Sequence, residues 1–164
     1  MALSEVDGVS TIAIESPVGR LVLGATERGL VSCSFGGGGG GEGESGPSAA
    51  RTIAAEAVEQ LTAYFAGARK TFDVPLDVRG TDFQRSVWDS LRAIPFGEMV
   101  SYGEVAKRIG NPKAVRAVGG ANNRNPLPIF VPCHRVVNSA GGLHGYGGGL
   151  PAKQWLLKHE GCAV

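Results

Sequence analysis

Cysteine is scarce in this chain, and long apolar runs are missing from its start. The three cysteines, Cys33, Cys133 and Cys162, form neither an even set for a disulfide framework nor a Cys-x-x-Cys pair with zinc-ligand spacing. We therefore expect a reducing compartment and no bound metal. Residues 1–5 include an acid and begin no apolar stretch, so we expect neither a signal peptide nor a membrane span, and a cytoplasmic protein.

Acidic residues are absent from one long stretch, because no Asp or Glu occurs between Glu104 and Glu160. The net charge of +1 hides this segregation: residues 1–79 hold six Lys/Arg and ten Asp/Glu, whereas residues 80–164 hold ten and five. The basic residues of the acid-free stretch are Lys107, Arg108, Lys113, Arg116, Arg124, Arg135, Lys153 and Lys158. Such clustering is typical of a surface that faces nucleic-acid phosphates. A merely solvated basic face would have the same composition.

The first part of the chain predicts a small β-rich unit with one helix. Apolar residues alternate or cluster at 11–15, 20–23 and 30–33, with turn signals between them, which favours a three-stranded meander. Ser48 is expected to cap a helix that ends near Gly67. Between these elements, the run Gly36 to Gly41 and the polar residues up to 46 predict a flexible surface loop. No Gly-Lys-Ser/Thr follows the glycines, which argues against a phosphate cradle.

The second part is helical and punctuated by capping signals. Capping boxes at 81–84 and 101–104 open two helices, and Trp88 in the first is expected in the core. Asn111 and Pro112 are expected to start a third helix, from Lys113 to about residue 123. Two short helices joined by a Gly-containing turn are typical of a helix-turn-helix. The fold class is therefore expected to be α/β (α+β), with a structural domain at 1–78 and a mainly helical domain at 79–164.

The helix after this turn has an unusual composition. Arg116 is its only long side chain between residues 114 and 121, and Gly119 and Gly120 each cost a helix about 1 kcal/mol relative to alanine. A helix that reads bases in the major groove would carry several Arg, Asn or Gln. The composition instead favours minor-groove or shape recognition. Packing of the glycines against another helix of the same protein is the alternative.

A candidate nucleophile follows a short apolar segment. Pro128 and Pro132 stiffen residues 127–132, which should deliver Cys133 to a fixed place, and His134 and Arg135 come next. A cationic, polar neighbourhood lowers the pKa of a thiol and so favours a reactive Cys133. A lone cysteine is usually an inert core residue, and only this setting argues against that interpretation.

These residues resemble the family of O6-alkylguanine-DNA alkyltransferases, also called methylated-DNA–protein-cysteine methyltransferases. The sequence Pro-Cys-His-Arg-Val, here residues 132–136, is the active-site signature of that family. The resemblance covers residues 83–161 and includes Gly-Asn-Pro-Lys-Ala, Arg-Ala-Val-Gly-Gly-Ala, Asn125-Pro126 and the segment from Trp155 to Gly161. Residues 1–78 resemble its less specific N-terminal domain.

The resemblance implies a reaction in which each molecule acts once. Cys133 would take the alkyl group from O6 of guanine and keep it as a thioether; O4-alkylthymine is a further candidate substrate. His134, linked to Cys133 through water and oriented by Glu160, would remove the thiol proton. Tyr102 would donate a proton to N3 of the departing guanine, and Asn125 would brace the segment before the cysteine. No cofactor is implied.

The resemblance also implies that double-stranded DNA is the partner and that the damaged nucleotide is flipped out through the minor groove. Arg116 would fill the gap that the nucleotide leaves. The flipped base would be held by Pro128, Val136, Tyr146 and Gly147. The DNA itself would contact Ala114, Arg116, Ala117, Gly119, Gly120, Asn123, Arg124 and Arg135. The protein is expected to be a monomer, and cooperative assembly on DNA stays open.

Three other functions remain open at this point. One is a non-enzymatic lesion-binding relative, a class that carries tryptophan in place of the cysteine, and Cys133 argues against it. A helix-turn-helix regulator is the second, weakened by the lack of base-reading side chains around Gly119 and Gly120. A cysteine hydrolase would need an oxyanion site that no motif identifies. Some relatives hold a structural zinc, but the cysteines and histidines outside residues 133–134 are unsuitably placed for one.

Overall fold

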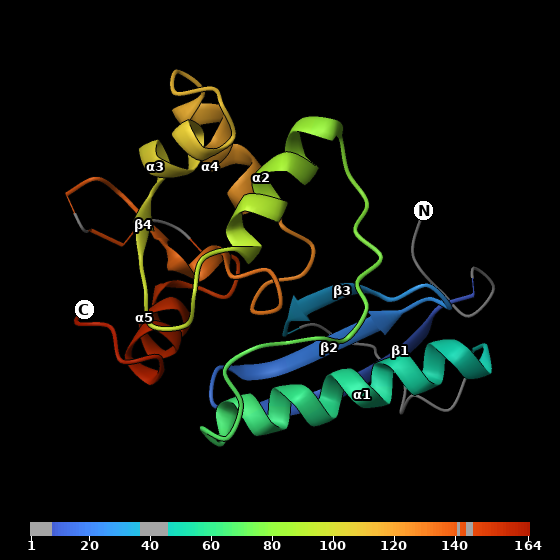
Figure 1. The fold of residues 1–164 in the computed structure, drawn as a ribbon. Helices are drawn as coiled ribbons and strands as arrows, with labels where there is room; N and C mark the ends of the chain where they lie inside the picture. Colours follow the sequence, from blue (N-terminus) through green and yellow to red (C-terminus); the bar gives the residue numbers. More distant parts are fainter. Residues whose placement is uncertain (1–7, 37–45, 141, 144–145) are drawn as a thin grey trace. The chain divides into compact units, whose positions relative to one another are not determined.

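The chain divides into an N-terminal unit, residues 1–79, and a C-terminal unit, residues 80–164 (Figure 1). The structure, a computed structural model, describes residues 8–36, 46–140, 142–143 and 146–164. The expected glycine loop, apart from residues 36 and 46, lies outside these described residues.

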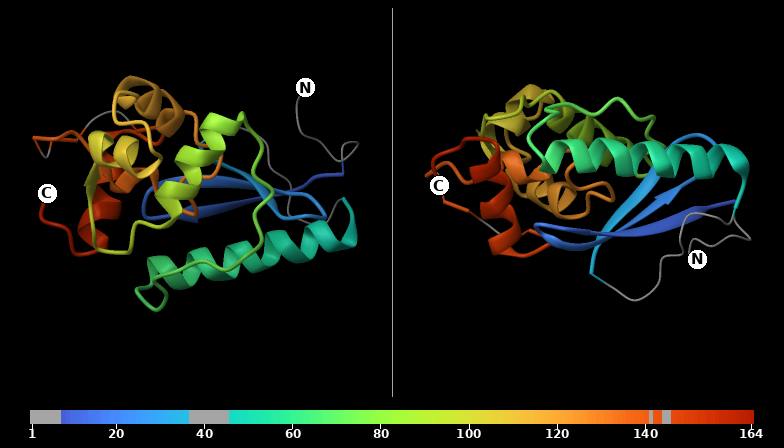
Figure 2. Two further views of the ribbon diagram at one scale, coloured as in Figure 1. Left: turned by 45° about the horizontal axis from the view of Figure 1, so that its top comes forward. Right: turned by 90° about the horizontal axis from the view of Figure 1, so that it is seen from below.

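A three-stranded antiparallel sheet forms the N-terminal unit together with one helix. Strands β1 (Ser10–Ser16), β2 (Gly19–Ala25) and β3 (Leu30–Phe35) follow one another in the sheet as in the sequence, which confirms the predicted meander. Helix α1 (Ser48–Phe65) runs along one face of the strands (Figure 2). The fully buried side chains of this unit include Leu21, Leu23, Leu30, Leu61 and Tyr64.

Ser48 does not cap α1, contrary to the prediction. Pro47 occupies the N-cap position with an extended backbone and provides no side-chain hydrogen bond, while Ser48 is already the first helical residue. The carbonyl of Ser48 instead accepts a hydrogen bond from Oγ1 of Thr52 at 3.1 Å. A proline has no N–H to satisfy, so the chain can enter the helix here without a serine cap.

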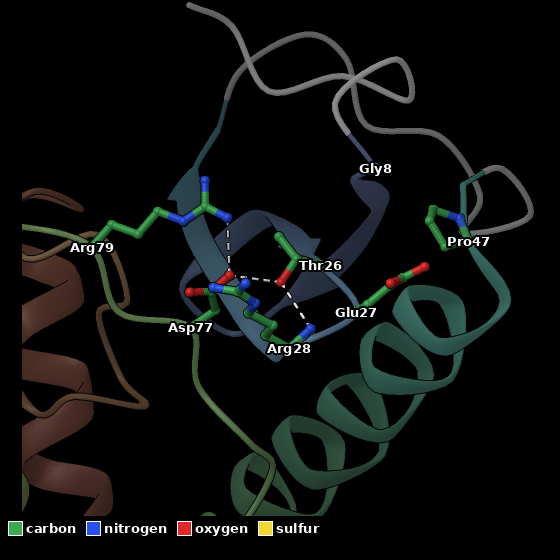
Figure 3. A pocket seen from close by; sticks show the side chains of 7 residues that line it. All are labelled: Gly8, Thr26, Glu27, Arg28, Pro47, Asp77 and Arg79. Carbon is green, nitrogen blue, oxygen red and sulfur yellow. Dashed lines mark hydrogen bonds and ion pairs between the residues drawn. The ribbon is translucent and has the colours of Figure 1, made fainter.

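The segment between α1 and residue 79 is hydrogen-bonded to strand β3 of the sheet. Leu30 donates its N–H to the carbonyl of Pro75 and accepts from the N–H of Asp77, each at 2.8 Å. An open pocket of about 280 Å³ lies at this end of the segment (Figure 3). Oγ1 of Thr26 donates to Asp77 at 2.7 Å, and Arg79 pairs with the same carboxylate at 3.0 Å. These contacts hold the segment between α1 and residue 79 in place.

The C-terminal unit is mainly helical. Its elements are α2 (Asp82–Arg92), β4 (Val100–Ser101), α3 (Tyr102–Arg108), α4 (Val115–Asn123), the 3₁₀ helix η2 (Cys133–Arg135), β5 (Val136–Val137) and α5 (Leu150–His159). Strands β4 and β5 pair in parallel, with Val100 opposite Val136. This pairing places the start of α3 beside the residues that follow η2. Together with the N-terminal sheet, these elements confirm the α+β fold class.

Helix α2 begins as its sequence predicts. Oγ1 of Thr81 accepts from the N–H of Gln84 at 3.1 Å, and the Gln84 side chain accepts from the N–H of Thr81 at 3.0 Å. Trp88 is buried, as expected, and its Nε1 donates to the carbonyl of Ala121 at 2.8 Å. This hydrogen bond joins α2 to α4.

The next two helix starts differ in part from the predictions. Ser101 caps α3 through the N–H of Glu104 at 3.0 Å, but the Glu104 carboxylate pairs with Arg108, so only half of the expected capping box forms. Helix α4 begins at Val115 rather than at residue 113, because the N–H of Ala114 bonds back to the carbonyl of Asn111 at 3.0 Å and closes a turn. The two helices still form a helix-turn-helix.

Among the described residues, no helix combines the length and apolar character that a membrane crossing requires.

We expect Thr81→Ala to lower stability by about 1 kcal/mol, because the first turn of α2 loses its side-chain cap. For a chain of this size, that loss lowers Tm by about 2–4 °C. Thermal unfolding followed by circular dichroism measures the change. Thr71→Ala, at an exposed position outside any helix, is the control and should leave Tm unchanged; an equal fall in both variants would contradict the capping role.

Candidate active site and nucleic-acid interface

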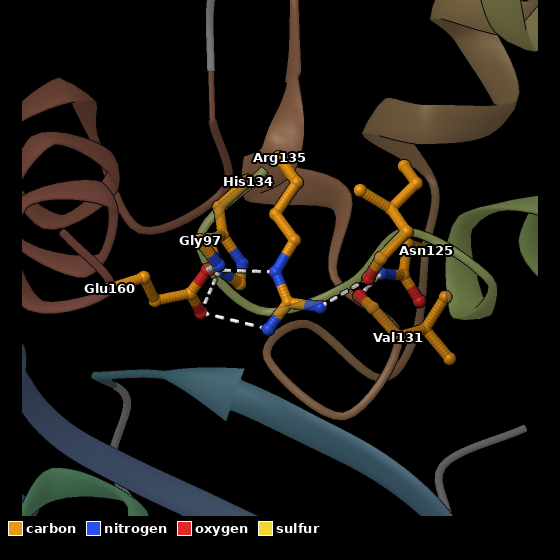
Figure 4. Close-up of polar contacts among 7 residues, drawn as sticks. Gly97, Asn125, Val131, His134, Arg135 and Glu160 are labelled. Carbon is orange, nitrogen blue, oxygen red and sulfur yellow. Dashed lines mark hydrogen bonds and ion pairs between the residues drawn. The ribbon is translucent and has the colours of Figure 1, made fainter. Parts of the chain in front are cut away.

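A buried apolar segment carries the chain from α4 to Cys133. Its residues Leu127, Ile129, Phe130 and Val131 are buried, and Ile129 has the unusual positive φ of 77°. Asn125 forms hydrogen bonds with both ends of this segment. Its Nδ2 donates to the carbonyl of Val131 at 2.7 Å (Figure 4). Its Oδ1 accepts from the N–H of Leu127 at 2.9 Å. The segment therefore holds Cys133 at a defined position relative to α4.

The Cys133 thiol is buried, with 5% of the residue exposed. Burial raises its pKa to about 11, against the opposing effects of a hydrogen bond with the Asn125 side chain and the charge of Lys153. The expectation of a lowered thiol pKa is thus wrong, because desolvation outweighs the nearby positive charge. At neutral pH only about one thiol in ten thousand would be ionised, so the resting side chain is the neutral thiol.

His134, the residue after Cys133, forms a buried pair with Glu160. Nε2 of His134 lies 2.8 Å from Oε2 of Glu160. Burial lowers the pKa of His134, although Glu160 acts against this shift, so the ring is neutral at pH 7. Burial alone would raise the pKa of Glu160, but hydrogen bonds from His134 and Arg135 hold it far below its usual range. An ionised carboxylate only accepts hydrogen bonds; Nε2 therefore carries the ring proton and Nδ1 holds a lone pair.

Arg135 does not face solvent, and its expected place on the DNA surface is wrong. Only 6% of the residue is exposed. Its Nε and Nη2 donate to the two oxygens of Glu160 at 2.8 and 2.9 Å, and its Nη1 donates to the carbonyl of Ile94 at 2.6 Å (Figure 4). A buried carboxylate needs a cationic partner, and arginine can bind both of its oxygens at once. Arg135 is therefore part of the support for Glu160.

Lys153 was also assigned to the basic surface by its sequence position, and it too is buried. Its Nζ donates to the carbonyl of Val136 at 2.8 Å. Burial lowers its pKa, while the charge of Cys133 acts in the opposite direction. The spacing of the buried residues Lys153, Leu156, Leu157 and Glu160 is a signal that could have shown that Lys153 lies on the inner face of α5.

Tyr102 reaches the thiol from the start of α3. The side chain is half-buried, and burial together with the neighbouring Cys133 raises the pKa of its phenol. Tyr102 therefore keeps its proton at neutral pH and can act as a donor.

The residues expected around the flipped base lie in two parts of the chain, 128–136 and 146–147. Pro128 and Val136 are buried. Tyr146 is half-buried and lies edge-on to His134, with ring centroids 6.5 Å apart. Gly147 is exposed, and a Cβ at this position would meet no atom within 4 Å. Tyr146 thus lies beside His134.

Helix α4 has one buried and one open face. Val118, Ala121 and Asn122 point inward, whereas Arg116, Ala117, Asn123 and Arg124 are exposed and Ala114 is half-buried at the N-cap. A Cβ added at Gly119 would meet no atom within 4 Å, and at Gly120 only Arg124, at 3.6 Å. Within the described residues, the glycines therefore do not serve helix packing, and the alternative of an internal helix contact fails. Because the two glycines have no side chains, the backbone of another molecule can approach this face of α4 closely.

Asn122 was not predicted as a site residue. It is 3% exposed, and its Nδ2 donates to the carbonyl of Cys133 at 3.4 Å. An asparagine near the end of a helix usually indicates only a helix stop, so its sequence position gave no functional signal.

Over the described ranges, no three His, Cys, Asp or Glu side chains lie together as metal ligands would, and all three cysteines are free thiols.

Comparisons with known proteins agree with this geometry. Residues 10–78 match the family model of the 6-O-methylguanine DNA methyltransferase ribonuclease-like domain, and residues 82–162 match that of the DNA binding domain of the same family. The methylated-DNA–protein-cysteine methyltransferase of Methanosarcina acetivorans is 52% identical over 148 residues, which cover 90% of this chain and 95% of that protein.

Solved structures give the same result. The crystal structure of Mycobacterium tuberculosis O6-methylguanine methyltransferase is 46% identical, with a TM-score of 0.79 and coverage of 93% of this chain and 92% of that one. A structure of the M. tuberculosis protein OGT in complex with DNA is 45% identical, with a TM-score of 0.81 and coverage of 92% and 91%. The resemblance stated from the active-site signature is confirmed, and the chain belongs to the 6-O-methylguanine DNA methyltransferase family.

Proposed function

We propose that this protein repairs alkylated DNA by moving the alkyl group from O6 of guanine to its own Cys133, irreversibly and once per molecule. The observation that carries the proposal is the buried pair of His134 and Glu160, which keeps a neutral imidazole with a lone pair on Nδ1 at the residue that follows Cys133, whose thiol is protonated. The same C-terminal unit exposes the glycine face of α4. The DNA complex of the M. tuberculosis relative supports duplex DNA as the partner.

In the proposed reaction, the sulfur of Cys133 forms a bond to the alkyl carbon while the bond from that carbon to O6 breaks and its electron pair passes to O6. The thiol proton moves through a water molecule to Nδ1 of His134, and Glu160 stabilises the resulting imidazolium. Tyr102 donates its proton to N3 of the leaving guanine and regains one from solvent. The product is a thioether, which has no carbonyl for water to attack, so Cys133 is not regenerated.

Access to O6 in a duplex requires that the nucleotide leave the base stack, which costs a few kcal/mol. Arg116 is exposed on α4 and would occupy the space left in the stack. Ala117 and Gly119 would let α4 approach the minor groove, with Ala114, Gly120, Asn123 and Arg124 at the DNA backbone. The flipped base would lie against Pro128, Val136, Tyr146 and Gly147. We propose that one monomer performs the whole reaction, in the cytoplasm.

Incubation with a duplex that contains O6-methylguanine should add one methyl group to the protein and no more, on Cys133. Intact-mass spectrometry with peptide mapping measures this, and Cys133→Ser, which retains Cys33 and Cys162, is the control. A duplex with O4-methylthymine tests the other candidate substrate in the same assay. Several turnovers per molecule, or methylation of the Cys133→Ser variant, would contradict the mechanism.

The rate of methyl transfer should fall at acid pH and level off above neutrality. Burial lowers the pKa of His134, so the ring accepts a proton above that pKa and loses this capacity as the pH falls through it, below about 6.5. Single-turnover rates between about pH 5 and pH 9 test this. A preformed thiolate would behave differently: because the thiol pKa is about 11, the rate would rise tenfold per pH unit over the whole range.

Arg116→Ala should slow repair of the duplex by more than about tenfold, because the extruded base is no longer replaced in the stack. The reaction with the free base O6-methylguanine needs no extrusion and should keep its rate. The control is Arg92→Ala, which removes an exposed cation from the end of α2. Equal losses on duplex and free base in the Arg116 variant would refute a role in flipping.

A further inference from the structure

Asn122 is a buried polar residue to which the mechanism above assigns no role. It lies in the last turn of α4 with 3% of its surface exposed. Its Nδ2 points to the carbonyl of Cys133, at 3.4 Å. A carbonyl oxygen can only accept, so the amide is oriented with nitrogen toward Cys133 and oxygen away from it. The side chain therefore belongs to the surroundings of the nucleophile.

The Oδ1 atom of Asn122 is buried and has no hydrogen-bond partner among the described protein atoms. Nδ1 of His134, the residue after Cys133, is also buried and also has no hydrogen-bond partner among the described protein atoms. Folded proteins seldom leave buried polar atoms unsatisfied, and a bound water commonly supplies the missing bond. Both atoms are acceptors here, since Nε2 of His134 holds the ring proton. One molecule with two O–H donors could satisfy both.

The proposed proton transfer needs such a molecule. A water between Cys133 and His134 accepts the thiol proton through its oxygen and donates one O–H to Nδ1. Its second O–H needs an acceptor in a site from which bulk water is excluded, because the thiol and the imidazole are both buried. Without that acceptor, the water would have no fixed orientation.

We propose that Asn122 is a positioning residue whose side-chain oxygen accepts the second hydrogen of the water that passes the Cys133 proton to His134. This inference rests on the function proposed above and adds a fourth member to the Cys133, His134 and Glu160 relay. The thiol loses its proton to the water as the water gives one to Nδ1, so the water is regenerated and the sulfur gains the electron pair with which it attacks. Asn122 changes neither charge nor protonation.

The other titratable groups around the relay are donors or already bonded, and Tyr146, whose ring lies edge-on to His134, has a hydroxyl that can itself donate to Nδ1, whereas the amide oxygen of Asn122 can only accept. Lys153 donates from α5 to the carbonyl of Val136, and Arg135 donates to Glu160 and Ile94. Tyr102, at the start of α3, keeps its phenolic proton. Glu160 is the carboxylate of the site, and both of its oxygens are bonded to His134 and Arg135.

Asn122→Leu, which is close in size and cannot accept a hydrogen bond, tests the role. The single-turnover rate at pH 7 should fall about tenfold, the usual order for loss of orientation at a proton-transfer step. The pH profile should also change, with the rate still rising up to about pH 9.5 instead of levelling off, because the reaction then depends on spontaneous thiol ionisation. The Kd for unmodified duplex should stay at its wild-type value, since Asn122 is on the buried face of α4.

Gln154→Leu, which removes an exposed amide from α5, is the matched control and should keep the wild-type rate and profile. A uniform loss of rate in the Asn122 variant with an unchanged plateau, or with a weakened Kd, would show that Asn122 only supports α4 and would overturn the proposal. Failure of the wild-type protein to accept a methyl group would instead refute the proposed function itself.

A second measurement needs no variant and remains valid if Asn122→Leu does not fold. In a high-resolution crystal structure of the unmodified protein, a water should lie within about 2.6–3.2 Å of both Asn122 Oδ1 and His134 Nδ1. A structure in which Oδ1 is satisfied by another donor, with no water shared between the two atoms, would also overturn the proposal.

Discussion

A single buried carboxylate organises the C-terminal unit. Glu160 ends α5 and receives four hydrogen bonds, one from His134, two from Arg135 and a longer one from the N–H of Gly97, while Arg135 also binds the carbonyl of Ile94 after α2. A charge out of contact with water is tolerated only with such partners, and removal of one partner of a buried ion pair typically costs about 3–5 kcal/mol. The same contact that joins α5, η2 and the end of α2 therefore also sets the tautomer of His134. Stability and chemistry depend on one interaction.

Burial of the nucleophile explains why the site needs this arrangement. A solvent-exposed thiol could ionise by itself, but burial raises the pKa of Cys133 to about 11, so little thiolate is present at neutral pH. In the proposed reaction, an adjacent base therefore takes the proton. A neutral, oriented imidazole meets this requirement, and two asparagines, Asn122 and Asn125, connect the same cysteine segment to α4. The helix that would contact the DNA is thus hydrogen-bonded to the backbone of the segment that carries Cys133.

Local sequence signals predicted the elements well where the decisive contacts are local. The reciprocal cap of Thr81 and Gln84, the three strands with their turns, and the core position of Trp88 were all confirmed. The predictions failed at the starts of two helices, where the sequence signal indicated the wrong first residue. Ser48 lost the cap position to a proline, and the turn closed by Asn111 delayed the start of α4 by two residues. Both errors concern the residue at which a helix begins, and at both starts the N-cap residue provides no side-chain hydrogen bond.

The sequence by itself determined the family and the lack of large side chains on the helix around Gly119, and it marked Cys133 as the candidate nucleophile, because these depend on residue type and order. Only the tertiary structure decided which charges are exposed. Arg135 and Lys153 were indistinguishable in the sequence from surface cations, yet both are buried by partners 17 to 41 residues away. The thiol pKa and the place of Asn122 were decided in the same way. Desolvation is a property of everything that surrounds a group, so it could not be derived from the chain's linear order.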